Sequence, residues 1–293
     1  MTTIASTGWL QELEFAIGTV RAAAAEIARF YDSGTAAIRA KGDDSPVTDA
    51  DLASDRIIRE RIGQTYPGDA LLTEEGADDP VRLSVRRCWI ADPLDGTQDF
   101  IDRTGQFDVF LALAMDGAPV VGVACHPPSG LVLAAAAGSG AWLDDGAIRQ
   151  PLRTLDATWE TPRLNTNRYH TQPDAWPLLR RVAHRADMIP PSAPSPFHPR
   201  AFFALNGVPP SYEAHLGIGP AAADGYIGGE WDLAAPDIIL REAGGRLTDE
   251  RGASLRYNQP DPMIRHGLIA ADSPVLHARI VTAFAAESRQ GVR

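Results

Sequence analysis

Five short apolar runs between residues 70 and 143 constrain the fold of this chain more than any other feature of its sequence. They read ALLTEE, RCWIAD, FDVFLALAM, PVVGVACHP and LVLAAAAGSGAWL. Turn residues such as Asp116-Gly117 and Ser129-Gly130 separate them. Runs of this length, bounded by turn residues, are typical of strands. The segment therefore predicts a sheet of neighbouring strands.

Helical patterns flank this segment on both sides. Residues 8–31 carry an apolar stripe at helical spacing, formed by Leu10, Leu13, Ile17, Val20, Ala24 and Ile27. A second helix should begin after Thr48, an N-cap residue, and run to about Ile62. Further helices are expected over residues 173–186, 233–245 and 273–289, and the pattern assigns no structure to the proline-rich segment 190–210.

The chain length and the absence of long apolar segments predict a large soluble protein. With 293 residues it should form either one two-lobed unit or two packed domains that share a cleft. No apolar run approaches the ~20 residues of a membrane helix, and the N-terminus lacks the pattern of a secretory signal. Cys88 and Cys125 are too few for a disulfide framework. We therefore expect a cytoplasmic protein with two reduced thiols and no membrane partner.

The net charge restricts the ligands that this chain can bind. There are 27 basic and 38 acidic side chains, a formal charge of −11, and the basic residues are scattered. A nucleic acid polymer is therefore not expected as a partner. An anionic ligand such as a phosphate ester would need bound cations to offset the negative field.

The segment WIADPLDGTQDF, residues 89–100, concentrates acids between two of the apolar runs. Pro93 favours a strand that ends at Asp92, and Asp95-Gly96-Thr97 should then turn the chain. A solvated Asp-Gly turn would explain the segment without any ligand. Two sharper alternatives fail on spacing. An EF-hand loop starting at Asp92 would need its Glu where Arg103 stands, and a haloacid-dehalogenase motif needs an acid where Pro93 stands.

Other acids occupy similar positions, although each has a local explanation. Glu74 and Glu75 follow a short apolar strand, where an acidic loop is common. Asp232 stands at the natural N-cap of a helix whose first turn would contain Pro236. Asp51, three residues after Thr48, fits a capping box. Together these residues supply oxygen ligands on separate loops, a set that favours magnesium over zinc or iron.

In combination these segments resemble the inositol monophosphatase family, within the larger group that includes fructose-bisphosphatases and nucleotide 3'-phosphatases. The matching segments are KGDDSPVTDAD, LLTEEG, WIADPLDGTQDF and WDLAAPDIILREAGG, in the family's order, between Arg39 and Ala271. The resemblance implies an α/β fold, a layered α/β/α/β/α sandwich, and a homodimer. It also implies an α+β lobe over residues 1–152 and an α/β lobe over residues 153–293 that contributes Asp232 and part of the substrate pocket.

The resemblance further implies a ligand set for Mg2+. Glu74 and Asp92, with the backbone carbonyl of Leu94, would bind the first ion. Asp92 would bridge to a second ion held by Asp95 and Asp232. Two divalent ions can stabilise both the attacking and the leaving oxygen of an in-line displacement.

The catalytic and substrate-binding residues follow from the same resemblance. Thr97, paired with Asp51, would orient the attacking water, and Glu75 stands next to that pair. Backbone N–H groups at Gly96 and Thr97 would contact the phosphate if a helix begins there. The substrate-binding residues would then be Asp95, Gly96, Thr97 and Asp232.

The predicted function is a Mg-dependent phosphomonoesterase acting on a small phosphorylated substrate. DPLDGTQDF followed by GQFDVFLAL, with LRYNQPDP around Tyr257, is similar to the branch that removes the 3'-phosphate of 3'-phosphoadenosine 5'-phosphate. Tyr257 and Arg256 equally fit ordinary packing and surface positions. An inositol or sugar-phosphate phosphatase is the alternative within the enzyme class. A non-catalytic, cation-binding relative is the alternative of another class.

Overall fold

The structure is a computed structural model that describes residues 8–42, 45–154, 160–167, 175–195, 197–203, 205, 210–218 and 226–289. The chain divides into two compact units. The first unit contains residues 1–151, 231–242 and 257–260, and the second contains residues 152–230, 243–256 and 261–293. Asp232, which the sequence analysis assigned to the second lobe, therefore lies in the first unit.

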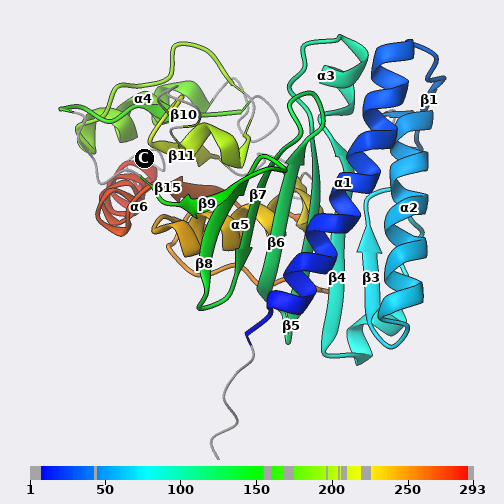
Figure 1. Ribbon diagram of the computed structural model, residues 1–293. Helices are drawn as coiled ribbons and strands as arrows, with labels where there is room; N and C mark the ends of the chain where they lie inside the picture. The colour runs from blue at the N-terminus through cyan, green and yellow to red at the C-terminus, as the bar shows by residue number, and fades with distance from the viewer. Residues whose placement is uncertain are drawn as a thin grey trace, which may run out of the picture. The chain divides into compact units, whose positions relative to one another are not determined.

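The first unit is built around one seven-stranded sheet (Figure 1). Its strand order is β3-β4-β5-β6-β7-β8-β9. The strands are β3 (Ala70–Thr73), β4 (Arg87–Asp95), β5 (Asp108–Met115), β6 (Ala118–His126), β7 (Leu131–Ala136), β8 (Gly140–Asp144) and β9 (Arg149–Leu152). β3 and β4 pair in parallel, while the pairs from β4 to β8 are antiparallel. The sheet predicted from the apolar runs is confirmed.

Helices cover both faces of this sheet. α1 (Leu10–Ser33) and α2 (Asp49–Thr65) share one core with alternate strand residues such as Trp89, Leu111 and Val123. Neighbouring residues of a strand point to opposite faces. Gly122 accordingly faces α5 (Glu230–Ala243), and a Cβ atom there would lie 2.8 Å from the carbonyl oxygen of Ala235. The sheet thus lies between α1 and α2 on one side and α5 on the other.

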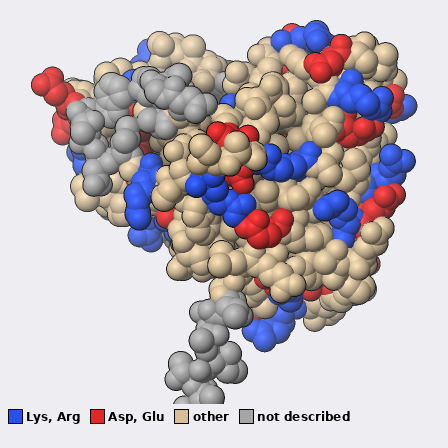
Figure 2. Space-filling view, in the orientation of Figure 1, with Lys and Arg blue, Asp and Glu red and all other residues tan. Residues whose placement is uncertain are grey.

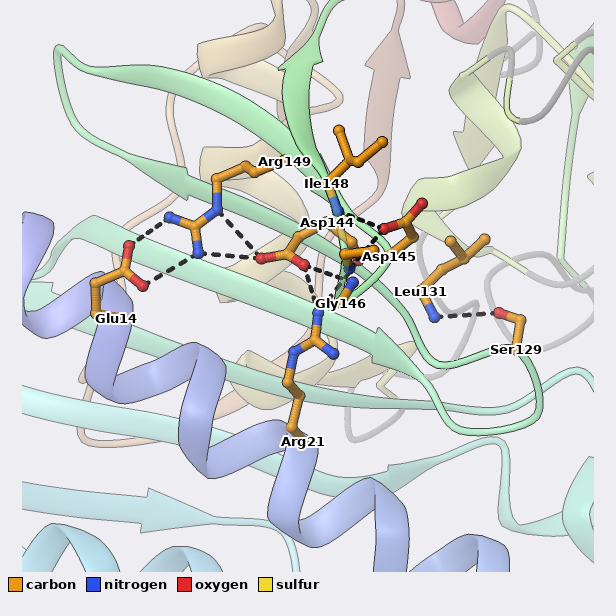
Figure 3. A network of polar contacts seen from close by, with 10 residues as sticks. Glu14, Arg21, Ser129, Leu131, Asp144, Asp145, Gly146, Ile148 and Arg149 are labelled. Atoms are coloured by element: carbon orange, nitrogen blue, oxygen red, sulfur yellow. Dashed lines mark hydrogen bonds and ion pairs between the residues drawn. The ribbon is translucent and has the colours of Figure 1, made fainter.

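An ion-pair network ties α1 to the end of the sheet (Figure 3). Arg21 of α1 contacts Asp144 at the end of β8 at 2.5 Å. Arg149 of β9 binds the same carboxylate at 3.0 Å and also pairs with Glu14 of α1. Because two cations share Asp144, the β8–β9 hairpin is fixed against the helix.

Short elements complete the first unit. They are the hairpin strands β1 (Ile38–Ala40) and β2 (Pro46–Thr48), the 3-10 helix η1 (Pro80–Ser84) and the one-turn helix α3 (Thr97–Ile101). Thr48 caps α2 as predicted, with an extended backbone and a side chain that accepts a hydrogen bond from Ala50 N–H. Cys88 and Cys125 are buried, and neither takes part in a disulfide.

The second unit has its own sheet and core. β10 (Leu164–Asn165), β11 (Ala214–Gly217), β15 (Leu268–Ala271) and β13 (Arg246–Asp249) form a four-stranded sheet in that order. α4 (Trp176–Arg185) and α6 (Pro274–Ser288) pack their apolar faces against β11 and β15. β12 (Gly228–Gly229) pairs with β14 (Met263–Ile264). Within segment 190–210, η3 (Pro199–Phe202) forms, while residues 196, 204 and 206–209 lie outside the described part.

The start of α5 differs from its prediction. The helix begins at Glu230, so Asp232 is its third residue and not its N-cap, and Pro236 lies in its interior. Proline cannot donate the helical hydrogen bond to the carbonyl four residues earlier, here that of Asp232. Burial of Ala234 and Ile238, both 0% exposed, offsets this loss.

Two further observations concern the surface. In the part of the chain that the structure describes, no helix is both long and apolar enough to cross a membrane. On the face shown in Figure 2, Lys and Arg side chains are interspersed with Asp and Glu side chains. This mixture agrees with the scattered basic residues of the sequence.

Candidate metal centre

Asp92 and Asp95 lie at an irregularity of β4. The pairing of β4 with β5 shifts register between these two residues, so that β4 carries an extra residue there. Pro93 has no N–H for the strand ladder, and the N–H of Leu94 instead donates to Asp92 Oδ1 at 2.9 Å. Such a bulge bends the strand and redirects its side chains. The strand predicted to end at Asp92 therefore continues to Asp95 through a bulge that presents both carboxylates.

Asp232 of α5 joins these two acids. The carboxylates of Asp92, Asp95 and Asp232 each offer one oxygen, and these oxygens all lie within 4.8 Å of one another. Asp92 is only 1% exposed. Sequence positions that are far apart thus converge at one point of the first unit.

The electrostatics of this cluster favour a bound cation. Burial, together with the neighbouring carboxylates of Glu74 and Asp95, raises the pKa of Asp92 well above its usual range. Burial and the carboxylates of Asp232 and Asp108 do the same to the pKa of Asp95. A nearby positive charge is what would keep such buried acids ionised at neutral pH. Carboxylate oxygens suit Mg2+, Mn2+ or Ca2+, so the residues present fit a divalent-cation site.

Glu74 and Glu75 occupy the centre of a tight turn after β3. The turn runs from Thr73 to Gly76, whose N–H donates to the Thr73 carbonyl at 3.4 Å. The Glu74 N–H donates to the Ala91 carbonyl of β4 at 3.3 Å. The turn is thereby attached to the strand that leads to Asp92.

Lys41, in the connection between β1 and β2, contacts both glutamates. Its Nζ atom lies 2.7 Å from Glu74 Oε1 and 2.7 Å from Glu75 Oε1. Burial alone would lower the pKa of Lys41, but the two carboxylates raise it overall. Burial raises the pKa of Glu75 to about 7, against the opposing effect of Lys41. Glu74 is thus paired with an ammonium group beside the three aspartates.

Thr97 and Asp51 are hydrogen-bonded to each other. The Thr97 hydroxyl donates to Asp51 Oδ1 at 2.8 Å and lies 3.2 Å from the Leu94 carbonyl oxygen. Asp51 Oδ2 accepts from the Thr48 N–H at 2.8 Å and from its hydroxyl at 2.5 Å. Burial raises the pKa of Asp51, while the bonds from Thr48 and Thr97 oppose that rise. The capping box and the Thr97 pair, which the sequence presented as separate explanations, coexist on one side chain.

Gly96 allows the chain to turn from β4 into α3. Its φ angle is 91°, in the left-handed region that favours glycine. A Cβ atom there would lie 2.9 Å from the Gln106 carbonyl oxygen. α3 begins at the next residue, Thr97.

The model of the inositol monophosphatase family matches residues 9–178 and 219–289. The chain belongs to the inositol monophosphatase family. It is therefore a phosphatase, and the resemblance inferred from its motifs is confirmed.

Individual members of the inositol monophosphatase family share much of the length of this chain. The 3'(2'),5'-bisphosphate nucleotidase CysQ of Salmonella typhimurium is 32% identical over 78% of this chain and 85% of its own. The histidinol-phosphatase of Mycobacterium tuberculosis is 30% identical over 84% of this chain and 86% of its own. The solved structure of the Thermotoga maritima IMPase has a TM-score of 0.71 at 22% identity, covering 96% of this chain and 99% of that one. This likeness confirms the predicted α/β sandwich fold.

Two residues near the metal centre were not singled out from the sequence. Lys41 opens the matching segment KGDDSPVTDAD, and its position there was the only available signal. Ser54 of α2 donates to the Pro93 carbonyl at 2.7 Å and so supports the bulge. A lone serine in a helix carries no pattern that would reveal this contact.

Proposed function

We propose that this member of the inositol monophosphatase family is a magnesium-dependent phosphomonoesterase whose favoured substrate is 3'-phosphoadenosine 5'-phosphate or a similar nucleotide. The observation that carries the proposal is the convergence of Asp92, Asp95 and Asp232 beside the Thr97–Asp51 pair. The nucleotide is supported by the similarity to the Salmonella relative named as a 3'(2'),5'-bisphosphate nucleotidase.

In this proposal the acids divide between two cations. Glu74, Asp92 and the Leu94 carbonyl would hold one Mg2+, and Asp92, Asp95 and Asp232 would hold a second. When bound, such ions lower the pKa of water and offset the charge of a phosphate. The buried carboxylates with raised pKa values support this assignment, because the cluster needs a countercharge.

The hydroxyl of Thr97 would orient the attacking water. Its proton is donated to Asp51, so the oxygen lone pairs remain to accept a hydrogen bond from water. Glu75, whose pKa is raised to about 7, would lie next to this network as a further acid–base group. Asp95, Gly96, Thr97 and Asp232 would contact the substrate.

Phosphate release from three esters tests the proposed function. Purified protein would be assayed on 3'-phosphoadenosine 5'-phosphate, inositol 1-phosphate and histidinol phosphate, each with Mg2+ and with a chelator. We expect kcat/KM for the nucleotide to exceed the others by at least about tenfold, and all activity to require the cation. A preference for inositol 1-phosphate would support the alternative substrate class. No release from any ester would identify a non-catalytic, cation-binding relative.

The remaining expectations from the sequence are part of the same proposal. We infer a homodimer from the family resemblance, which light scattering of the purified protein would test. The two buried thiols, which form no disulfide, support a reducing compartment such as the cytoplasm. A lobe boundary near residue 152 is supported by the start of the second compact unit at that position.

A further inference from the structure

Arg59 of α2 contacts the turn that carries Glu74 and Glu75. We propose that Arg59 is a positioning residue that fixes this turn, and thereby the Glu74 carboxylate, for the divalent cation of the proposed function. The inference rests on that function only in assuming that a cation binds beside Glu74. Arg59 acts through the two ends of the turn, Thr73 and Gly76, and not through the glutamates themselves.

The Arg59 guanidinium is held from its own helix. Its Nε donates to Asp55 Oδ2 at 2.5 Å, one helical turn earlier. Asp55 is 8% exposed, so the carboxylate that anchors the guanidinium is itself nearly enclosed. An arginine held in this way has lost much of its side-chain freedom before it contacts the turn.

The other end of the guanidinium binds the first residue of the turn. One terminal nitrogen of Arg59 donates to the Thr73 hydroxyl. Thr73 is 3% exposed and is the last residue of β3. A partly buried, charge-assisted hydrogen bond therefore links α2 to the start of the turn.

The last residue of the turn packs directly on the same guanidinium. A Cβ atom added at Gly76 would lie 1.5 Å from the Arg59 terminal nitrogen and 2.7 Å from its Cζ. The φ angle of Gly76 lies outside the positive range, so this glycine is needed for space and not for its backbone conformation. Arg59 thus contacts both ends of the four-residue turn, and the two glutamates lie between those ends.

Lys41 and Arg59 have different tasks at this turn. Lys41 pairs with the carboxylates themselves, at 2.7 Å from each. Arg59 contacts the Thr73 hydroxyl and the Gly76 backbone, and its charge faces Asp55. Loss of Arg59 should therefore alter where the Glu74 carboxylate lies, with little direct change in the charge next to it.

Cation binding by the purified, metal-free protein tests this inference. Mn2+ would be titrated calorimetrically into wild type, Arg59→Met and Arg61→Met. Arg61 is the matched control, because it lies on the same helix and donates to Thr19 of α1. We expect Arg59→Met to weaken Mn2+ binding by about tenfold or more, the scale for groups that orient metal ligands, and Arg61→Met to leave it unchanged. Equal Mn2+ affinity in the two variants would overturn the inference.

A second measurement reports on the order of the turn in the metal-free protein. Amide hydrogen exchange of Glu74 and Gly76 should be faster in Arg59→Met than in Arg61→Met. Gly76→Ala should weaken Mn2+ binding in wild type, and by a smaller factor in an Arg59→Ala background, where the space is open. Strictly additive effects of Gly76→Ala and Arg59→Ala would contradict the proposed contact.

These experiments distinguish a failure of the role of Arg59 from a failure of the proposed function. Wild-type protein that binds Mn2+ but hydrolyses no ester would remove the proposed function, while weaker binding in Arg59→Met would still support the role of Arg59. If wild type hydrolyses an ester and both arginine variants bind Mn2+ with equal affinity, the proposed function is supported and the role of Arg59 is overturned. Absence of Mn2+ binding by wild type would overturn both.

Discussion

Asp51 uses its two carboxylate oxygens for different tasks. Oδ2 closes the capping box at the start of α2, and Oδ1 accepts the hydroxyl proton of Thr97. Because the cap fixes the carboxylate, the direction of the Thr97 lone pairs is set by the start of a helix. A structural and a proposed catalytic role therefore depend on the same side chain.

Removal of the Thr97 hydroxyl should separate these two roles. Thr97→Ala keeps every carboxylate of the metal centre and the capping box of Asp51. We expect the rate of phosphate release to fall by about 100-fold, the scale for positioned proton-transfer groups, with the Mg2+ dependence nearly unchanged. Initial rates over a Mg2+ titration measure both quantities. Thr104→Ala, which removes an exposed hydroxyl bonded to Asp99, serves as control.

If Thr97→Ala instead moves the Mg2+ requirement strongly, or leaves the rate intact, the proposed role of Thr97 is wrong.

His277 should make the stability of the protein depend on pH. It is 4% exposed, and its Nε2 lies 2.8 Å from the Thr248 hydroxyl. Burial, assisted by Arg246, lowers its pKa from 6.5 to about 4. Between these values the unfolded chain binds the proton and the folded chain does not. The free energy of unfolding should therefore fall as pH drops from 6.5 to 4, and this contribution is fully present above pH 6.5.

Denaturant unfolding of His277→Gln at several pH values checks this expectation. Between pH 4 and 6.5 the slope of unfolding free energy against pH should be smaller in the variant by up to about 1.36 kcal/mol per pH unit, which corresponds to one proton taken up on unfolding. An unchanged slope would show that His277 titrates normally in the folded protein.

Several functional contacts at the residue scale could not be predicted. The acids of the candidate metal centre were singled out because they recur in a known order around apolar runs. Lys41 and Arg59 carry no such pattern, because one basic residue in a loop or on a helix looks like solvated surface. Their partners become visible only when segments distant in sequence are brought together.

At the scale of the elements, α5 contributes the third aspartate of the candidate metal centre. It carries Asp232 and packs against β6 at Gly122, where there is no room for a side chain. A Cβ at Gly122 would approach Ile238 Cγ2 within 2.3 Å and the Ala235 carbonyl oxygen within 2.8 Å. The position of the third aspartate therefore depends on one glycine of the neighbouring strand.

Gly122→Ala should displace α5. We expect a loss of about 1–3 kcal/mol in unfolding free energy, typical of an overpacked core, together with weaker Mn2+ binding because Asp232 moves. Urea unfolding and calorimetry measure these effects. Gly63→Ala, on the exposed side of α2 with no neighbour within 4 Å, should instead stabilise by about 0.5–1 kcal/mol. Equal stability of the two variants would mean that α5 packs more loosely than its contacts indicate.

The elements differ in how well the sequence predicted them. α1 and α2 followed from long apolar stripes and a capping residue, and they match within a few residues. The start of α5 was misplaced because the prediction put Pro236 in the first turn of the helix. In the structure the helix begins earlier, since burial of its apolar residues stabilises it in spite of the internal proline. The parallel pairing of β3 with β4 was not predictable, because alternation along a strand does not specify its partner.

At the scale of the whole molecule, cation binding should raise the free energy of unfolding. Ions that bind only the folded chain stabilise it by about 2.7 kcal/mol at 100 times their Kd. We expect the melting temperature to rise with Mg2+ and to fall back when a chelator is added. Asp95→Asn keeps the side-chain shape but removes one charge of the cluster, so most of the Mg2+-induced rise should vanish. The same rise in Asp95→Asn as in wild type would place the ion elsewhere.

The assignment of residues 231–242 to the first unit has a consequence for synthesis on the ribosome. When residue 151 has been added, the seven strands are nearly complete, but α5 is still about 80 residues from being made. At 5–20 residues per second this interval lasts roughly ten seconds. During that time the face of the sheet around Gly122 has no helix on it, and Asp92 and Asp95 lack their third partner. The nascent chain therefore passes through a stage in which it offers both a site for chaperones and an unfinished cation site.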